Sequence, residues 1–225
     1  GSVKKLPERL KECGTNIIRI KMTLKNTLEN VSLTSTTNIE KNFEEIAKIM
    51  LYDGYLKVRN EYRVYIKTVE FYLHAEEGSL LNVSDPIVYH RNGKPHKGDV
   101  PYFPIMTLHA HVSGFDITFE NEALKYRASA LIRTYAIFDE KSQCFIETKK
   151  GCKYDDRSTY LYNYLNGFSV NGDNDIIWVD QASSAKHELN LPTPRRNVFE
   201  YVGEEKTNKR DMRLWSYSRK NEIEV

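Results

Sequence analysis

The chain has 225 residues, of which 40% are hydrophobic, and a formal net charge of +2. This length is enough for one sizeable hydrophobic core, and the composition excludes a disordered chain. The weak positive charge permits a nucleic-acid partner but does not indicate one, because the usual signature is a concentrated basic face.

Residues 3–50 carry apolar side chains at roughly helical spacing, interrupted by a Ser/Thr/Asn-rich break at residues 31–38. Asn38 is placed to cap a second helix that extends to Met50. We therefore divide the chain into an N-terminal helical extension at 3–40 and one main domain at 41–225.

Most of the elements predicted after Gly54 are strands. Residues 55–59 and 62–73 are predicted as two strands, which Asn60 and Glu61 join in a hairpin. Residues 74–104 form a long polar loop, of a kind that is usually functional or disordered in a compact domain. The other expected elements are strands at 105–112, 114–120, 126–138, 176–179 and 213–217, and a short helix at 158–168. The predicted fold is α+β: a single domain with N-terminal helices, then a curved, mostly antiparallel β-sheet.

The number of cysteines and the hydropathy of the chain predict the cellular compartment of the protein. The cysteines are Cys13, Cys144 and Cys152, an odd and sparse set that builds no disulfide framework and no Cys-x-x-Cys metal motif. Cys144 and Cys152 are the one pair placed to flank a hairpin. No apolar run is long enough to cross a membrane, and no signal peptide is visible. We therefore expect a reduced, monomeric cytoplasmic protein (nucleoid-associated in a bacterium) with no cofactor and no membrane partner.

Chemically useful side chains share the faces of predicted strands. Strand residues two apart point the same way, so Glu70 and Tyr72 share one face, and His109 and His111 share another. Arg133 emerges from a third strand. A carboxylate among aromatic rings is what an enzyme needs to hold a base by stacking and to direct water at the bond beneath it. The alternative is purely structural: a half-exposed strand with a salt-bridged Glu70, and an ion-paired Arg133.

Several motifs stand in order between residues 43 and 219: Ala47-Lys-Ile-Met-Leu-Tyr52, Thr68-Val-Glu-Phe-Tyr72, Asp85-Pro-Ile-Val-Tyr-His90, Thr107-Leu-His-Ala-His111 before Gly114, Leu131-Ile-Arg133, Pro194-Arg195 and Leu214-Trp-Ser-Tyr217. In this order they resemble the motifs of the alkyladenine (3-methyladenine or methylpurine) DNA glycosylases. The resemblance implies a diverged member of that family with its α+β fold. It also implies a role in base excision repair of DNA damage, by hydrolysis of the N-glycosidic bond of a modified base such as an alkylated purine.

The resemblance implies a chemical role for three of the matching residues. Glu70 would be the general base that activates water for attack at the sugar C1′, and Arg133 would orient Glu70 or the water. Glycosidic cleavage has an oxocarbenium-like transition state, so a nearby carboxylate also helps electrostatically. No lysine stands in the motif as an amine nucleophile, and a monofunctional glycosylase is therefore implied. Tyr72 would stack on the flipped base.

Other matching residues would bind the base. His111 would complete the sandwich with Tyr72, and His90 would touch the face or edge of the base. His109 would support them and line the DNA-facing surface. The asparagine that sets selectivity in the family falls near Glu120 or Asn121, and Ser113 stands where the family inserts a bulky side chain. These two departures leave open another base, a single-stranded substrate or lost activity.

The C-terminal tract is rich in basic residues diluted by acids. Arg195, Arg196, Lys209 and Arg210 are the candidates for contacts with the nucleic-acid backbone.

Two other functions fit the same residues. His90, His109, His111 and Glu70 form a recognised ligand set for zinc or iron, although His-x-His spacing alone is poor evidence and we expect no metal. A catalytically inactive module on the glycosylase fold is the main alternative. It would bind nucleic acid, a nucleotide ligand or a partner protein through the same pocket.

Overall fold

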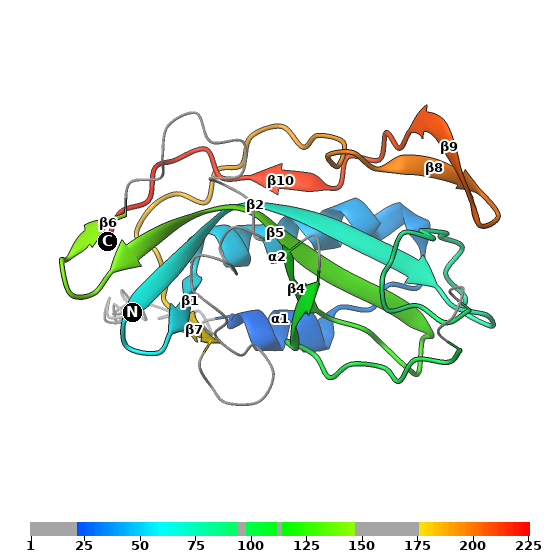
Figure 1. Cartoon of the computed structure of the whole chain (residues 1–225), viewed down its shortest axis with the longest axis horizontal. Coiled ribbons are helices and arrows are strands. Elements are labelled where there is room, and N and C mark those ends of the chain that lie inside the picture. The colour runs from blue at the N-terminus through cyan, green and yellow to red at the C-terminus, as the bar shows by residue number, and fades with distance from the viewer. Residues whose placement is uncertain (1–21, 94–97, 112–113, 147–175) are drawn as a thin grey trace, which may run out of the picture.

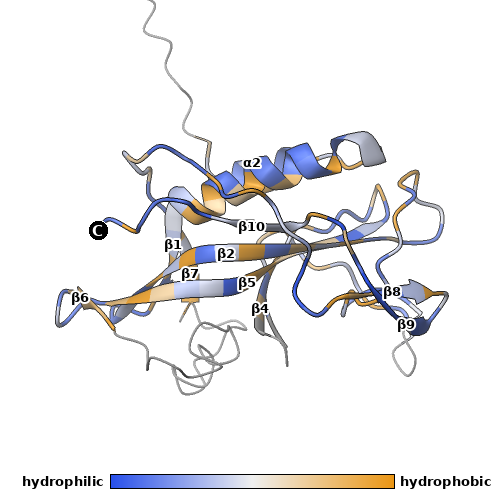
Figure 2. Cartoon of the chain, turned by 90° about the horizontal axis from the view of Figure 1, so that it is seen from above, coloured by the Kyte–Doolittle hydropathy of each residue, from blue (hydrophilic) through white to orange (hydrophobic). Residues whose placement is uncertain are grey.

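The computed structural model describes residues 22–93, 98–111, 114–146 and 176–225. In this part of the chain, a curved antiparallel sheet carries helices on one side (Figures 1 and 2). Eight described strands follow the order β3-β4-β5-β2-β1-β7, with β10 beside β2 and β6 beside β5. They are β1 (Gly54–Val58), β2 (Tyr62–Ala75), β3 (Leu108–His111), β4 (Gly114–Thr118), β5 (Tyr126–Asp139), β6 (Cys144–Phe145), β7 (Ile176–Asp180) and β10 (Ser216–Ser218). The fold is therefore α+β, as expected.

Helix α2 (Ile39–Tyr52) covers the sheet because its apolar side chains recur at helical spacing. Figure 2 shows the apolar side of α2 turned toward the strands. Phe43 is fully buried and stacks on Phe71 of β2, with 4.3 Å between the ring centroids. Asn38 holds the N-cap position that the sequence predicted, but its side chain makes no capping hydrogen bond. The short 3-10 helix η1 (Thr36–Asn38) runs directly into α2.

The described part of the N-terminal segment belongs to the same core. Helix α1 (Leu24–Asn30) starts at Thr23, whose hydroxyl accepts a hydrogen bond from the Asn26 amide at 3.1 Å. Leu24 and Leu28 are buried in one cluster with α2 and the sheet. The predicted boundary at residue 40 therefore does not separate this part from the main domain; residues 3–21 lie outside the described residues.

Successive side chains along each strand point to opposite faces of the sheet. On β2, Val69, Phe71 and Leu73 pack into the core, so Glu70 and Tyr72 lie on the face away from α2. A bulge near Lys67 shifts the register of β2 against β5, and the pairing is regular from Val69 to Ala75. The strand segment that carries Glu70 is therefore paired on both sides, with β5 and with β10.

The predicted hairpin at residues 55–73 is confirmed, with Val58 opposite Tyr62. The loop begins later than expected, because β2 continues to Ala75. A hairpin of β8 (Phe199–Val202) and β9 (Glu205–Arg210) was not predicted, and Figure 1 shows it at one end of the molecule. The helix expected at 158–168 lies outside the described residues. Among those described, no helix is long and apolar enough to cross a membrane.

Candidate functional site

Glu70 is a buried carboxylate held by donors on both oxygens. It is 2% exposed. Its Oε1 accepts a hydrogen bond from the Arg196 amide at 2.8 Å. Its Oε2 lies 3.3 Å from the Arg133 Nε and 3.4 Å from the Tyr72 hydroxyl. The half-exposed strand weighed as an alternative is therefore wrong for Glu70, although its ion pair with Arg133 is present.

Arg133 and the turn after Pro194 hold this carboxylate in place. The Arg133 Nη2 donates to the Arg196 carbonyl at 3.1 Å, so one guanidinium contacts both Glu70 and the turn. Asn197 has a φ of 58°, a left-handed conformation that asparagine tolerates better than most residues. This turn places the Arg196 amide against Glu70.

A pocket of about 100 Å³ opens beside Glu70. Its lining combines flat rings, apolar side chains and a few polar groups: Tyr72, Ile87, Val88, Tyr89, Asp116, Ser129 and Leu131. Glu70 itself is outside this lining, but it contacts Tyr72 and pairs across the strands with Leu131. Aromatic walls around a small pocket, with a few polar groups, are typical of a ligand site.

The pocket is built on one row of cross-strand neighbours. Glu70 is opposite Leu131, Leu131 is opposite Asp116, and Asp116 is opposite His109. Residues directly opposite in a sheet project to the same face. The sheet therefore gathers side chains from β2, β5, β4 and β3 at the site, although they are far apart in the sequence.

His109 belongs to an aromatic cluster next to the pocket. Its ring lies 5.5 Å from that of Tyr89, 5.1 Å from that of Phe103 and 5.9 Å from that of His90, between centroids. This position fits the supporting role that the sequence suggested. His111 is the last residue of β3, but its side chain lies outside the described residues, as does Ser113.

His90 and Glu120 are buried and do not line the pocket. They are 3% and 4% exposed, and the His90 Nδ1 contacts the Glu120 carboxylate. The Arg127 guanidinium and the Phe103 amide also donate to Glu120, at 3.1 Å and 2.7 Å. The expected direct contact of His90 and Glu120 with a base is therefore corrected: long-range pairing ties both side chains to the protein.

Arg127 holds the long loop against this side of the sheet. It is fully buried and donates to Glu76 at 2.7 Å and to the Pro101 and Val100 carbonyls at 3.1 Å and 2.6 Å. Its guanidinium lies 3.7 Å from the ring centroid of Tyr102. The described part of the loop is thus ordered by an arginine that the sequence reasoning missed.

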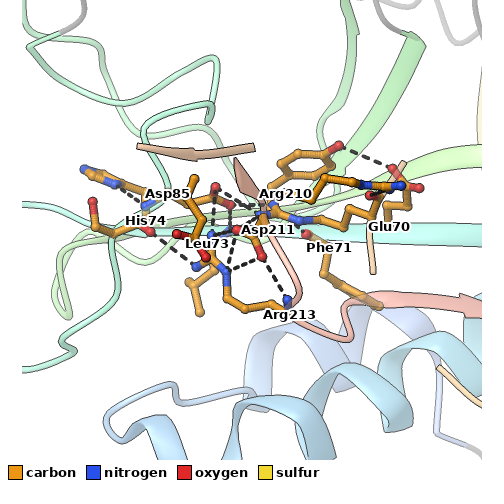
Figure 3. Close-up of polar contacts among 12 residues, drawn as sticks. Glu70, Phe71, Leu73, His74, Asp85, Arg210, Asp211 and Arg213 are labelled. Atoms are coloured by element: carbon orange, nitrogen blue, oxygen red, sulfur yellow. Dashed lines mark hydrogen bonds and ion pairs between the residues drawn. The ribbon is translucent and has the colours of Figure 1, made fainter. Parts of the chain in front are cut away.

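Arg195 is also fully buried, which corrects its assignment to the nucleic-acid backbone. It donates to Asp85 at 2.6 Å and 3.2 Å and to Asp211 at 3.0 Å. Arg213 donates to the same carboxylates, and Figure 3 shows Asp85, Asp211 and Arg213 converging. The Arg195 guanidinium also covers the Tyr72 ring at 4.6 Å. Its role is to support the pocket wall from behind.

The other three basic candidates are exposed. Arg196 is next to Glu70 through its amide, and the Arg210 guanidinium contacts the Arg195 carbonyl at 3.4 Å. Lys209 pairs with Glu200 at 2.9 Å on the hairpin of β8 and β9. The side chains of all three are accessible to solvent.

Tyr72 and His74 have pKa values that differ from their ordinary values. Burial, with the added charge of Glu70, raises the pKa of Tyr72, so its hydroxyl remains a donor to Glu70. Burial lowers the pKa of His74. The His74 Nδ1 accepts a hydrogen bond from the Asp85 amide at 3.0 Å, so this nitrogen carries no proton.

Metal ligation and disulfide pairing involve residues that are only partly described. Within the described ranges, no group of three or more His, Cys, Asp or Glu residues is arranged to hold a metal ion. Cys144 is exposed with a free thiol, and Cys152 lies outside the described residues.

Comparison of the chain with known proteins gives no relative. No protein-family model, no curated protein and no solved structure matches it. The function must therefore be argued from the site itself.

The sequence reasoning missed Asp116, although a signal was present. Residues 115–120 alternate strictly between apolar and polar side chains, so Asp116 shares a face with Glu120. No such alternation could indicate that Tyr89 lines the pocket, because Tyr89 lies in the long loop.

Proposed function

We propose that this protein is a monofunctional DNA glycosylase of the alkyladenine type, which hydrolyses the N-glycosidic bond of a flipped, modified base. The observation that carries the proposal is Glu70: a buried carboxylate, fixed by Arg133 and the Arg196 amide, at the edge of a pocket with Tyr72 and Tyr89 in its walls. The order of sequence motifs gives independent support.

The geometry suits the chemistry of that reaction. Pulling a base out of a duplex costs a few kcal/mol, and stacking on the aromatic rings of Tyr72 and Tyr89 would offset part of this cost. The carboxylate of Glu70 would accept a proton from the attacking water and stabilise the oxocarbenium-like sugar. Arg196 and Arg210, which are exposed near Glu70 and Arg195, would contact the phosphates on either side.

One observation favours the second candidate, a binding module without catalysis. Both oxygens of Glu70 already accept hydrogen bonds or an ion pair from protein groups. A carboxylate has about four lone-pair sites, so room for a water remains, but the same contacts would also suit a purely structural anchor.

The test is release of bases from methylated, deaminated and hypermodified DNA, double- and single-stranded, by wild type and Glu70→Gln. We expect Glu70→Gln to keep the fold and DNA binding and to lose about 10²- to 10⁴-fold in base release, the usual contribution of a general base. The matched control is Glu140→Gln, because Glu140 pairs with Arg63 away from the pocket. Release by Glu70→Gln at the wild-type rate overturns the assigned chemistry. Binding without release from any substrate supports the binding module.

A further inference from the structure

A groove lies next to the pocket and has no part in the proposed hydrolysis. It has a volume of about 480 Å³ and is lined by residues of β8 and by residues 84–86 and 211–213; we call it the hairpin groove. The pocket is lined by residues 87–89, which continue the same segment of the loop. The Arg195 guanidinium contacts both spaces, because it covers the Tyr72 ring of the pocket and pairs with Asp85 of the groove. The groove and the pocket are therefore neighbours.

The hairpin groove presents flat groups to a ligand. Phe199 and Tyr201 of β8 line it, and both are half-buried. Arg213 also lines it, with its guanidinium 4.1 Å from the Trp215 ring centroid and its side chain 31% exposed. The Nε and Nη2 of Arg213 donate to Asp211, so its edge is occupied and its open face is left for a ligand. Aromatic rings and guanidinium planes are the groups on which unpaired nucleobases stack.

The acids in the lining of the groove are paired with cations. Asp85 and Asp211 are each paired with both Arg195 and Arg213. Glu200 pairs with a lysine of β9 at 2.9 Å. The groove therefore carries little uncompensated negative charge that would repel a nucleic-acid strand.

Exposed cations connect the groove to the pocket. The Lys206 Nζ lies 4.5 Å from the centroid of the Phe199 ring, and Arg210 is opposite Phe199 in the hairpin. The Arg210 guanidinium also donates to the carbonyl of the residue before Arg196, and the Arg196 amide donates to Glu70. One series of contacts thus runs from Glu70 to Phe199. A phosphate between two adjacent nucleotides would meet Arg196 and Arg210 along it.

We infer that the hairpin groove binds the base next to the flipped base, so that the substrate is single-stranded DNA. The inference rests on the proposed function, because it names the form of the substrate that the same site takes. A base in the groove has left its own stack and its partner strand. A duplex would therefore have to open at two neighbouring positions, each at a cost of unstacking and unpairing, whereas a single strand pays much less.

Equilibrium binding by fluorescence anisotropy tests this without requiring any reaction. The probes are a single-stranded oligothymidylate, its duplex with oligoadenylate, and a strand of abasic sites with the same number of phosphates. We expect wild type to bind the thymidylate strand at least about 5-fold more tightly than the abasic strand, since each stacked base contributes to affinity. It should also bind this strand more tightly than the duplex.

The variants are Phe199→Ala and Tyr201→Ala. Each should lower the affinity for the thymidylate strand toward that for the abasic strand and leave the abasic strand bound as before. Tyr55→Ala is the matched control, because Tyr55 is a half-buried ring on β1, which Figure 1 shows at the other end of the molecule from the hairpin. Equal affinity of wild type for the two single strands, or a difference that both groove variants keep in full, overturns the inference.

A measurement on wild type decides the question if both variants fail to fold. An oligothymidylate that carries 5-iodouracil is photocrosslinked to the protein, and the modified residues are identified by mass spectrometry. We expect crosslinks on Phe199 or Tyr201. Their absence from the hairpin overturns the inference.

Base release by wild type and Glu70→Gln separates this inference from the proposed function. Binding of the single strand that depends on Phe199 and Tyr201, with no release from any modified DNA, supports the groove and removes the glycosylase proposal. Glu70-dependent release at equal rates from duplex and single strand, unchanged in both groove variants, keeps the glycosylase proposal and overturns the role of the groove.

Discussion

Replacing Arg195 by methionine gives the sharpest test of how the site is supported. Arg195 is fully buried, and its partners Asp85 and Asp211 are 2% and 5% exposed. The substitution leaves two buried carboxylates short of a donor and removes a hydrogen bond to the Phe71 carbonyl at 3.2 Å. Breaking a buried ion pair from one side costs about 3–5 kcal/mol. Because Arg213 still pairs with both acids, we expect Arg195→Met to lower the free energy of unfolding by about 3 kcal/mol, at the low end of this range.

The assay is urea unfolding followed by circular dichroism, with Arg196→Met as the control. Arg196 is exposed and uses only backbone groups at the site, so its substitution should change the free energy of unfolding by no more than about 0.5 kcal/mol. A decrease of less than about 1 kcal/mol in the free energy of unfolding of Arg195→Met would refute the claim that Arg195 balances the buried negative charges of Asp85 and Asp211.

The same experiment has an expected pH dependence. Burial by itself would raise the pKa of Asp211, but hydrogen bonds from Arg213 outweigh it and hold this pKa below its ordinary value. Asp211 therefore stabilises the fold above its unfolded pKa, and this contribution is lost as the pH falls through the lower folded value. In Arg195→Met the Asp211 carboxylate can protonate more easily, so the difference in stability from wild type should shrink as the pH is lowered toward about 4.

Three further substitutions test the packing and the pocket. Gly54→Ala should destabilise the fold by about 1–3 kcal/mol in urea unfolding, because the added Cβ would lie 2.3 Å from the Trp178 ring and 2.5 Å from the Val179 carbonyl oxygen. Phe43→Ala should lower the free energy of unfolding by about 3–5 kcal/mol in the same measurement, because it leaves a cavity where Phe43 stacks on Phe71. A decrease of less than about 1 kcal/mol would contradict this packing. Tyr72→Ala should weaken binding of DNA with a flipped base by about 1–3 kcal/mol in fluorescence titration, and unchanged affinity would show that Tyr72 does not stack.

Local patterns predicted much of the fold. Residues 62–73 and 126–138 were predicted as strands and form most of β2 and β5, and the period of two along the first placed Glu70 and Tyr72 on one face. The apolar spacing between Ile39 and Met50 predicted helix α2. These features depend on side chains that are close in the sequence, so a single chain without relatives is sufficient to find them.

Charged residues were less predictable, because their partners are far away in the chain. Arg195 and Arg196 are adjacent and look alike in the sequence, yet one is 0% exposed and the other is exposed beside Glu70. His90 was expected at the base but is paired with Glu120. No local pattern distinguishes an arginine that contacts a phosphate from one that compensates buried aspartates.

The sequence by itself determined helix α2, the long strands β2 and β5, and the face on which Glu70 and Tyr72 lie. Only the tertiary structure brought Asp116 into the same row, through the register of β4 on β5 and of β5 on β2. The physical reason is that strand register follows from turns and core packing across the whole sheet, whereas alternation needs only the next two residues.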